Sequence, residues 1–270
     1  MPEGAARRKI VDMFTVQPAR AAISPETWVH YAEDLAALLR LLERGEHDVA
    51  HGALARRVAE TLGGWGAPHT TLQPVEITID NTASERYTAL IIDAPDTIGF
   101  LYEFTSALAL NGLYIAQVAV ESVGQRVHDT LYLCDAQGRK ITATEKQREL
   151  RAATVLVKHF THLLPQSPNP ESALLHFREF LGQLFLRPDW PDALTSLARQ
   201  EVLIALAQLL GVSDFLWEDF LRMQYANLFP VVSAVDELAQ AKDKAQLRAE
   251  LRAVMAVEDW RAALNAFKDR

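Results

Sequence analysis

The sequence predicts an α+β protein in which a compact mixed unit lies between two all-helical segments. Apolar residues recur at three-to-four spacing before about residue 70 and again after about residue 165, which is typical of helices with one buried face. Between these segments the spacing falls to two residues, as it does in half-buried strands. We therefore expect a helical segment over 1–70, an α+β unit over 71–165 and a helical region over 166–270.

The composition indicates an ordinary globular protein and excludes several classes of function. The 270 residues are 49% hydrophobic and 23% charged. A net charge of −8 argues against a general nucleic-acid partner. No apolar run approaches the roughly 20 residues needed to span a bilayer, and MPEGAARRKIVDMF lacks the sustained apolar core of a signal peptide, so we expect a cytoplasmic protein with no membrane partner. Cys134 is the only cysteine, which excludes an intrachain disulfide.

The first segment carries clear helix signals. Ser24 and Pro25 can begin a helix, and Gly45 can end it, with a second helix expected over 46–62. Apolar residues at three-to-four spacing predict one buried face on the first helix. These residues are Trp28, Tyr31, Leu35, Leu38, Leu39 and Leu42. The glycine-rich stretch over 63–68 breaks the pattern and predicts a domain boundary near residue 70.

The central unit alternates strand and helix signals. We expect strands over 75–79, 87–92, 113–122 and 126–134 and a final helix over 144–164. Thr97 is placed to cap a helix that Gly112 would end. The expected buried face of that helix holds Ile98, Leu101, Thr105 and Leu108. Because a helix and not a strand follows residue 143, the strand over 75–79 is expected to complete the sheet.

The loop DAPDTIG, residues 93–99, lies between a strand and a helix, where many ligand sites begin. It has one glycine and lacks the glycine-rich or Gly-Lys-Ser/Thr patterns of phosphate sites. Asp93 and Asp96 would also repel a phosphate group, so we do not expect this loop to bind a nucleotide. The free amides of a helix N-terminus can still hold a carboxylate.

Residues 74–160 resemble an ACT domain, in particular those that end bacterial PII uridylyltransferases. The leading VEITIDN strand, the DAPDTIGFLY loop and the GQRVHDTLYLCD hairpin fall in that family's order. The resemblance implies a ferredoxin-like sandwich that pairs with a second ACT domain, by homodimerisation or within a fuller protein, and binds an amino-acid effector, plausibly glutamine. It implies that the effector contacts Asp96, Thr97, Ile98 and Gly99, with Asn111 and Ile115 on the facing rim. The family's usual Arg-Pro-Gly is Pro-Asp-Thr-Ile-Gly here, which implies a longer or reshaped loop.

Residues 168–270 resemble the helical region ahead of the catalytic domain in glutamine synthetase adenylyltransferases. NPESALLHFREFL and LLGVSDFLWEDFLRMQYANLFPVV carry this likeness. No Gly-Ser followed by Asp-x-Asp, the carboxylate pair that would hold magnesium, occurs in the sequence. We therefore expect a non-catalytic, regulatory N-terminal part of a larger nucleotidyltransferase, with glutamine synthetase or a PII-type protein as a partner. ATP and magnesium are expected only in a catalytic domain outside these residues, and no catalytic residue, cofactor or metal is expected within them.

Two other interpretations stay open from the sequence. The ACT unit could serve only for pairing, as a scaffold with no ligand, since a fold does not fix a function. Glu43, His47 and His51 recur every fourth residue and could bind a metal, although a solvated helix face is the preferred interpretation. His128 and Asp129 are neighbours on an expected strand, so their side chains should point to opposite faces and not share a metal.

Overall fold

A computed structural model describes residues 24–63, 71–187, 190–191 and 199–212, together with the single positions 13, 217, 248 and 252. The chain divides into two compact units, residues 1–50 and residues 51–270, and each is described by itself. Apart from the single positions 217, 248 and 252, the part of the expected helical region that follows residue 212 lies outside the described residues. Among the residues described, no helix is both long enough and apolar enough to cross a membrane.

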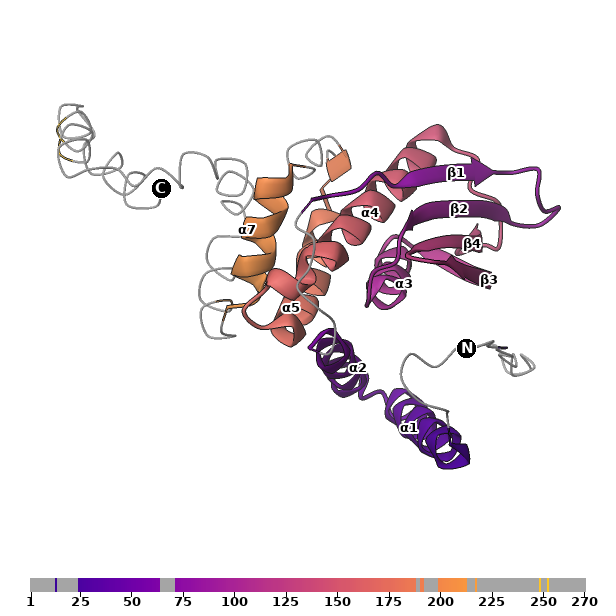
Figure 1. The fold of residues 1–270 in the computed structure, drawn as a ribbon. Coiled ribbons are helices and arrows are strands. Elements are labelled where there is room, and N and C mark those ends of the chain that lie inside the picture. Colours follow the sequence, from indigo (N-terminus) through magenta and orange to yellow (C-terminus); the bar gives the residue numbers. More distant parts are fainter. Residues whose placement is uncertain are drawn as a thin grey trace. The chain divides into compact units, whose positions relative to one another are not determined.

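The first helices form as their end signals predict. Helix α1 spans Pro25–Glu43 and α2 spans His47–Leu62 (Figure 1). The Ser24 hydroxyl accepts a hydrogen bond from the Thr27 amide, 3.3 Å away, and so caps the first turn of α1. Gly45 ends the helix with φ of +77°, a conformation that glycine adopts without strain.

The predicted buried face of α1 is wrong. None of the residues of this helix is buried. Trp28, Tyr31, Leu35, Leu39 and Leu42 are each between 41 and 50% exposed. The periodicity is that of an amphipathic helix, but a period identifies a face and does not say what covers it.

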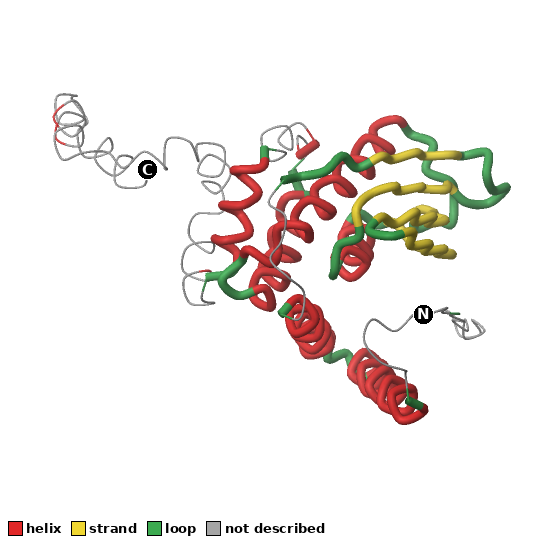
Figure 2. Tube along the Cα trace, viewed as in Figure 1, coloured by secondary structure: helices red, strands yellow, loops and turns green. Residues whose placement is uncertain are grey.

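The second unit contains an antiparallel sheet with the strand order β1-β2-β4-β3 (Figures 1 and 2). The strands span Glu76–Asp80 (β1), Thr88–Pro95 (β2), Leu113–Val123 (β3) and Arg126–Asp135 (β4). Strand β1 comes first in the chain and pairs at the sheet edge with β2, which confirms that the leading strand completes the sheet.

Helix α3, Phe100–Leu110, connects β2 to β3, and helix α4, Thr144–Leu163, follows β4. Alternate residues of β2 and β4, such as Leu90 and Leu131, are buried against these helices. The result is a ferredoxin-like ACT domain flanked by helices, as the sequence predicts.

The predicted buried face of α3 needs correction. The buried residues are Phe100, Glu103, Phe104, Ala107 and Leu108. Leu101 is 36% exposed and Thr105 is exposed. The stripe that packs contains Phe100, Phe104, Ala107 and Leu108, which also recur at three-to-four spacing and include two large aromatic side chains.

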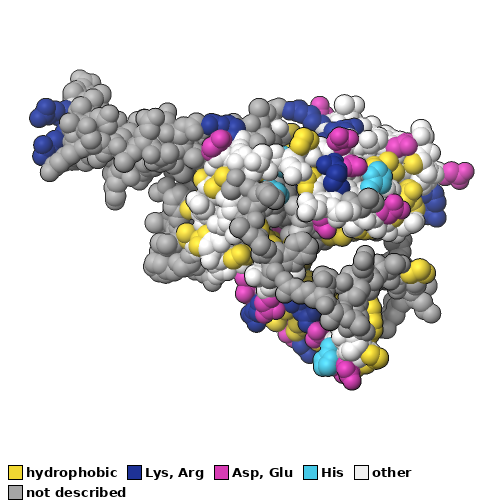
Figure 3. All heavy atoms as spheres, in the orientation of Figure 1, with side chains coloured by type: hydrophobic (Ala, Val, Ile, Leu, Met, Phe, Trp, Pro, Cys, Tyr) yellow, Lys and Arg dark blue, Asp and Glu magenta, His cyan; other side chains and the backbone are white. Residues whose placement is uncertain are grey.

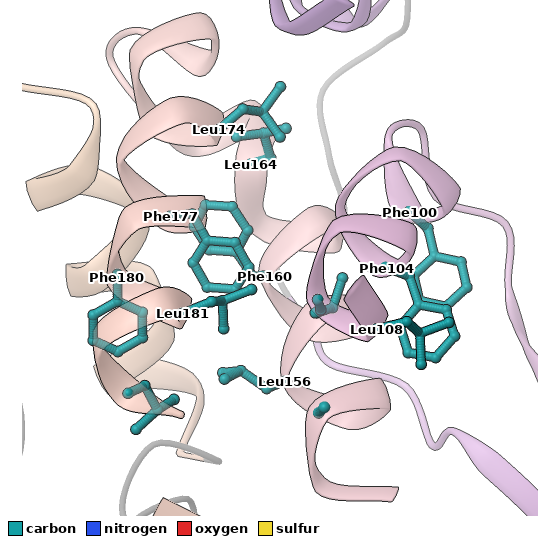
Figure 4. Packing of buried hydrophobic residues seen from close by; sticks show 14 of the residues in the cluster. Phe100, Phe104, Leu108, Leu156, Phe160, Leu164, Leu174, Phe177, Phe180 and Leu181 are labelled. Atoms are coloured by element: carbon teal, nitrogen blue, oxygen red, sulfur yellow. The ribbon is translucent and has the colours of Figure 1, made fainter. Parts of the chain in front are cut away.

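The core continues from the ACT domain into the helices that follow it. A short 3-10 turn, η1 (Leu164–Gln166), joins α4 to α5 (Pro170–Leu184), and α7 (Gln200–Leu210) packs against both helices. Phe160 of α4 stacks on Phe177 of α5 with 3.6 Å between ring centroids (Figure 4). The same cluster includes Phe100 and Phe104 of α3, so the hydrophobic core is continuous across residue 165. The domain boundaries near residues 70 and 165 stay predictions.

Candidate functional site

The loop between β2 and α3 holds the first four predicted effector residues. The Asp96 amide donates to the Gln125 carbonyl at 2.9 Å, which ties the loop to the turn between β3 and β4. Gly99 precedes α3 with φ of +86°, and the Phe100 amide donates to the Thr97 carbonyl at 3.3 Å. The predicted capping role of Thr97 is therefore wrong, because Gly99 is the N-cap residue. The Thr97 hydroxyl lies 3.3 Å from the hydroxyl of Thr161 on α4.

Helix α2 covers the glycine of this loop. A Cβ atom at position 99 would lie only 2.8 Å from Cγ1 of Val58, so Gly99 permits the close approach as well as the left-handed backbone. The Tyr102 hydroxyl donates to the carbonyl of His51 at 3.1 Å, which holds α2 against the start of α3. Ala55 of the same helix is fully buried in the core cluster. The loop glycine is thus in contact with a side chain of this chain.

Charged side chains are buried beneath the loop. Asp129 on β4 faces the helices and is 2% exposed, and its Oδ1 has no hydrogen-bond partner among the described residues. Burial raises the pKa of Asp129 to about 6, although the nearby Lys158 cation opposes this change. Lys158 is also 2% exposed, and burial lowers the pKa of its ammonium to about 8. Its Nζ lies 4.1 Å from the centroid of the Phe100 ring, a cation–π distance.

The open face of the sheet carries a separate ion pair. Arg126 donates hydrogen bonds to the Asp93 carboxylate, and these hold the pKa of Asp93 below its usual range. Nδ1 of His128 lies 3.7 Å from the same carboxylate. His128 is exposed and Asp129 is buried, which confirms that these neighbours point to opposite faces. The described residues contain no group of three His, Cys, Asp or Glu side chains that could hold a metal ion.

Two cavities lie near the predicted effector residues. One, of about 10 Å³, has room for one water molecule and is lined by Thr97 and Lys158 together with Gln73, Val75, Pro95, His159 and His162. The other, of about 500 Å³, lies at the opposite end of the sheet, next to Asn111. It is lined by Gly112, Leu113, Asp135, Arg139, Lys140, Ile141, Thr142, Ala143 and Lys146. Its cations are engaged within the chain: Arg139 bonds Asp135, Lys146 bonds Glu149, and Lys140 bonds the Asn81 carbonyl.

The structure places the two predicted rim residues far along the sheet from the loop. Asn111 ends α3, and its side-chain amide donates to the Ala107 carbonyl at 3.1 Å. Ile115 is partly buried and pairs with Leu133, whereas Pro95, next to the loop, pairs with Arg126 at the other end of β4. One chain therefore does not bring the loop and the rim residues together, and a shared site would need two ACT domains.

Glu103 is a buried acid that the sequence analysis missed. It is fully buried on α3, and neither of its carboxylate oxygens has a hydrogen-bond partner among the described residues. Burial raises its pKa to about 8, and the charge of Arg178 on α5 opposes this change only in part. The available signal was its spacing, since Glu103 follows Phe100 by three positions and precedes Ala107 by four on one helical face.

The fold and the glycine loop define the class of this domain, a ferredoxin-like ACT fold. Comparison with known proteins gives a more particular relation. A stretch of 77 residues is 39% identical to the bifunctional uridylyltransferase/uridylyl-removing enzyme of Ruegeria pomeroyi, and it covers 28% of this chain and 8% of that enzyme. A stretch of 110 residues is 33% identical to the enzyme of the same name from Gluconobacter oxydans, covering 41% of this chain and 10% of that enzyme.

A third relative, also a bifunctional uridylyltransferase/uridylyl-removing enzyme, comes from Bradyrhizobium diazoefficiens. It is 37% identical over 78 residues, which are 29% of this chain and 8% of that enzyme. The matched stretches therefore span a tenth or less of the length of these relatives. No family model matches the chain, and no solved structure matches it. The chain thus shares a short homologous region with these nucleotidyltransferases.

Proposed function

We propose that this chain is a regulatory part of a nucleotidyltransferase in which the ACT domain senses an amino acid such as glutamine. One observation carries the proposal: the chain shares a homologous stretch with bifunctional uridylyltransferases and folds as an ACT domain. The finer proposal is that the full protein is a glutamine synthetase adenylyltransferase, with glutamine synthetase or a PII-type protein as its partner. The resemblance of residues 168–270 supports this finer proposal.

The effector site would form between two ACT domains. Strand β3 lies at the sheet edge and exposes Tyr114, Val118 and Val120, so its free backbone groups can pair with a second sheet. Pairing would bring a loop from one domain toward the Asn111 and Ile115 end of another. An amino acid could then change activity only if it binds one arrangement of the pair more tightly than another.

Isothermal titration of this chain with glutamine and a panel of other amino acids tests the sensor. We expect binding heat with glutamine, and heat with a different amino acid would reassign the effector. The variant Asp96→Ala should weaken binding, because the carboxylate lies in the loop. Glu201→Ala, which removes an exposed carboxylate from α7, is the matched control and should bind normally. If no amino acid produces heat or a thermal shift, the sensor proposal is wrong.

The structure also favours a second candidate, a scaffold that pairs without a ligand. Val58 occupies the space beside Gly99, and the cavity next to the loop has room only for one water molecule. An effector that contacts Gly99 would have to displace α2. Titration of a Val58→Ala variant separates the two candidates, since tighter binding than in the wild type indicates a sensor covered by α2, and no binding in either form indicates a scaffold.

Identifying which nucleotidyl group is transferred, and to which substrate, requires the full-length protein. Incubation with labelled ATP or UTP and with glutamine synthetase or a PII-type protein would show which substrate is modified. We expect adenylyl transfer to glutamine synthetase. Uridylyl transfer to a PII-type protein would retain the regulatory proposal and replace the finer one.

A further inference from the structure

The ammonium group of Lys158 is buried in a way that surface cations are not. Figure 3 shows Lys and Arg side chains at the surface beside Asp and Glu side chains, where water screens their charges. Lys158 on α4 is only 2% exposed, and no hydrogen bond to its ammonium is formed among the described residues. Its Nζ lies over the Phe100 ring instead. A buried cation of this kind costs free energy unless nearby negative charges offset the cost.

Two carboxylates from different elements act on this cation through their charge. Burial lowers the pKa of Lys158 to about 8, and the carboxylates of Asp129 and Asp96 oppose this change, Asp129 more strongly. Burial raises the pKa of Asp129 to about 6, Lys158 opposes that change, and Asp96 adds to it. Asp129 is buried on β4, whereas Asp96 is exposed in the loop. At pH 7 one cation therefore interacts with a buried carboxylate and with a loop carboxylate.

Helix α4 meets the loop directly at this point. Lys158 lines the small cavity next to the loop together with Pro95 and Thr97, the two neighbours of Asp96 in the chain. Further along α4, the Thr161 hydroxyl donates to the Thr97 hydroxyl at 3.3 Å. Residues three positions apart on a helix share a face, so Lys158 and Thr161 approach the loop from the same face of α4. The ammonium group is thereby held beside the loop that carries Asp96.

We propose that Lys158 is a positioning residue of the effector site, which controls how strongly Asp96 attracts the ammonium group of an amino acid. The inference rests on the proposed sensor function, because it requires that Asp96 contact the effector. A cation beside Asp96 competes with the effector's ammonium group for the carboxylate. Asp129 moderates this competition, since its buried negative charge offsets part of the charge of Lys158. Lys158 and Asp129 therefore act on effector binding in opposite directions without touching the effector.

Isothermal titration of the full chain at pH 7 tests these opposite directions. The titrant is glutamine, or whichever amino acid of the panel gives heat with the wild type. Lys158→Met removes the charge and should lower the dissociation constant by about threefold to fivefold, whereas Asp129→Asn should raise it by a similar factor. In the Lys158→Met background Asp129→Asn should have little effect, because burial without the cation keeps Asp129 protonated and neutral. Arg199→Met removes an exposed cation at the start of α7 and is the matched control, with an unchanged dissociation constant.

A purely structural role for the two residues gives a different result. Weaker binding in both variants would show that Lys158 and Asp129 only support the fold, and unchanged binding in both would show that they do not act on the loop. Either result overturns the proposal. If circular dichroism shows that neither variant folds, the wild type decides: the NMR signal of the Lys158 ammonium should shift when the amino acid is added, and a constant signal overturns the proposal. If no amino acid gives heat with the wild type, the sensor function itself is wrong, and this inference is wrong with it.

Discussion

Helices α1 and α4 carry the same kind of apolar periodicity and meet different environments. Helix α4 buries Leu150, Leu156 and Phe160 against the sheet and the helices that follow. Helix α1, with an equally regular stripe, buries none of its residues. The difference teaches that the spacing of apolar residues identifies the apolar face of a helix. Whether that face is buried depends on which other elements pack against the helix. For α4 these are α3, η1 and α7.

The largest contrast is expected from truncation of one large side chain in each helix. Phe160→Ala removes a ring that is fully buried and stacked on Phe177, and it should lower the free energy of unfolding by about 4 kcal/mol. Leu35→Ala should change it by less than about 1 kcal/mol in dilute monomer, because that side chain is 44% exposed. Urea unfolding followed by circular dichroism measures both values. Similar losses in the free energy of unfolding for the two variants would contradict this expected difference between the helices.

The second prediction concerns the buried acid in the packed region. The pKa of Glu103 is raised to about 8 in the folded state from 4.5, so the folded chain retains a proton that the unfolded chain releases between these pH values. The stability contributed by this group therefore falls as pH rises from 4.5 to 8. Glu103→Gln should be more stable than the wild type by on the order of 3 kcal/mol at pH 9, with little difference at pH 4.

Urea unfolding at several pH values checks this expectation. Glu33→Gln, on α1, is a matched control because Glu33 is exposed, and its stability relative to the wild type should not change with pH. A constant difference between Glu103→Gln and the wild type from pH 4 to 9 would show that Glu103 is not held protonated by burial.

A smaller effect is expected where α2 meets the loop. Gly99→Ala should lower the free energy of unfolding by about 2 kcal/mol, since alanine is disfavoured at φ of +86° and its Cβ would overlap Val58. In a Val58→Ala background the overlap disappears and about 1 kcal/mol of backbone strain remains. A double-mutant cycle measures the interaction between the two positions. Strictly additive effects would mean that α2 does not press on Gly99.

The smallest pair of effects compares two helix caps. Asn169 caps α5 through its side-chain oxygen, as Ser24 caps α1. Asn169→Ala should lower the global free energy of unfolding by about 1 kcal/mol, because α5 belongs to the packed core. Ser24→Ala should leave global stability unchanged and speed amide exchange only in the first turn of α1. Exchange followed by NMR distinguishes the two, and a global loss from Ser24→Ala would place α1 within the cooperative unit.

Much of the fold follows from local signals in the sequence. The alternation over 75–79 and the turn glycines located the strands, and the helix after residue 143 indicated that β1 completes the sheet. The start of α3 was misplaced because Thr97 is a good capping residue by type, whereas the backbone turns at Gly99. A capping preference of about 1 kcal/mol is easily overridden by tertiary packing.

The candidate site was less predictable than the fold. The loop was found because its glycine and its position between strand and helix are local features. The buried pair Asp129 and Lys158 was not, because it joins residues from a strand and a later helix that only the folded chain brings together. The contact of Val58 with Gly99 likewise joins positions 41 residues apart, beyond the reach of any periodicity.

The place of β1 in the sheet has a consequence for synthesis of the protein. Because this edge strand precedes β2, every strand of the sheet has left the ribosome once residue 135 has emerged. Two of the three strand pairs join chain neighbours, and only β2 and β4 must meet across a longer separation. Such local pairing favours fast folding. The nascent sheet can therefore form its ladder, with α3 packed on it, before helix α4 has emerged to complete the cover of its inner face.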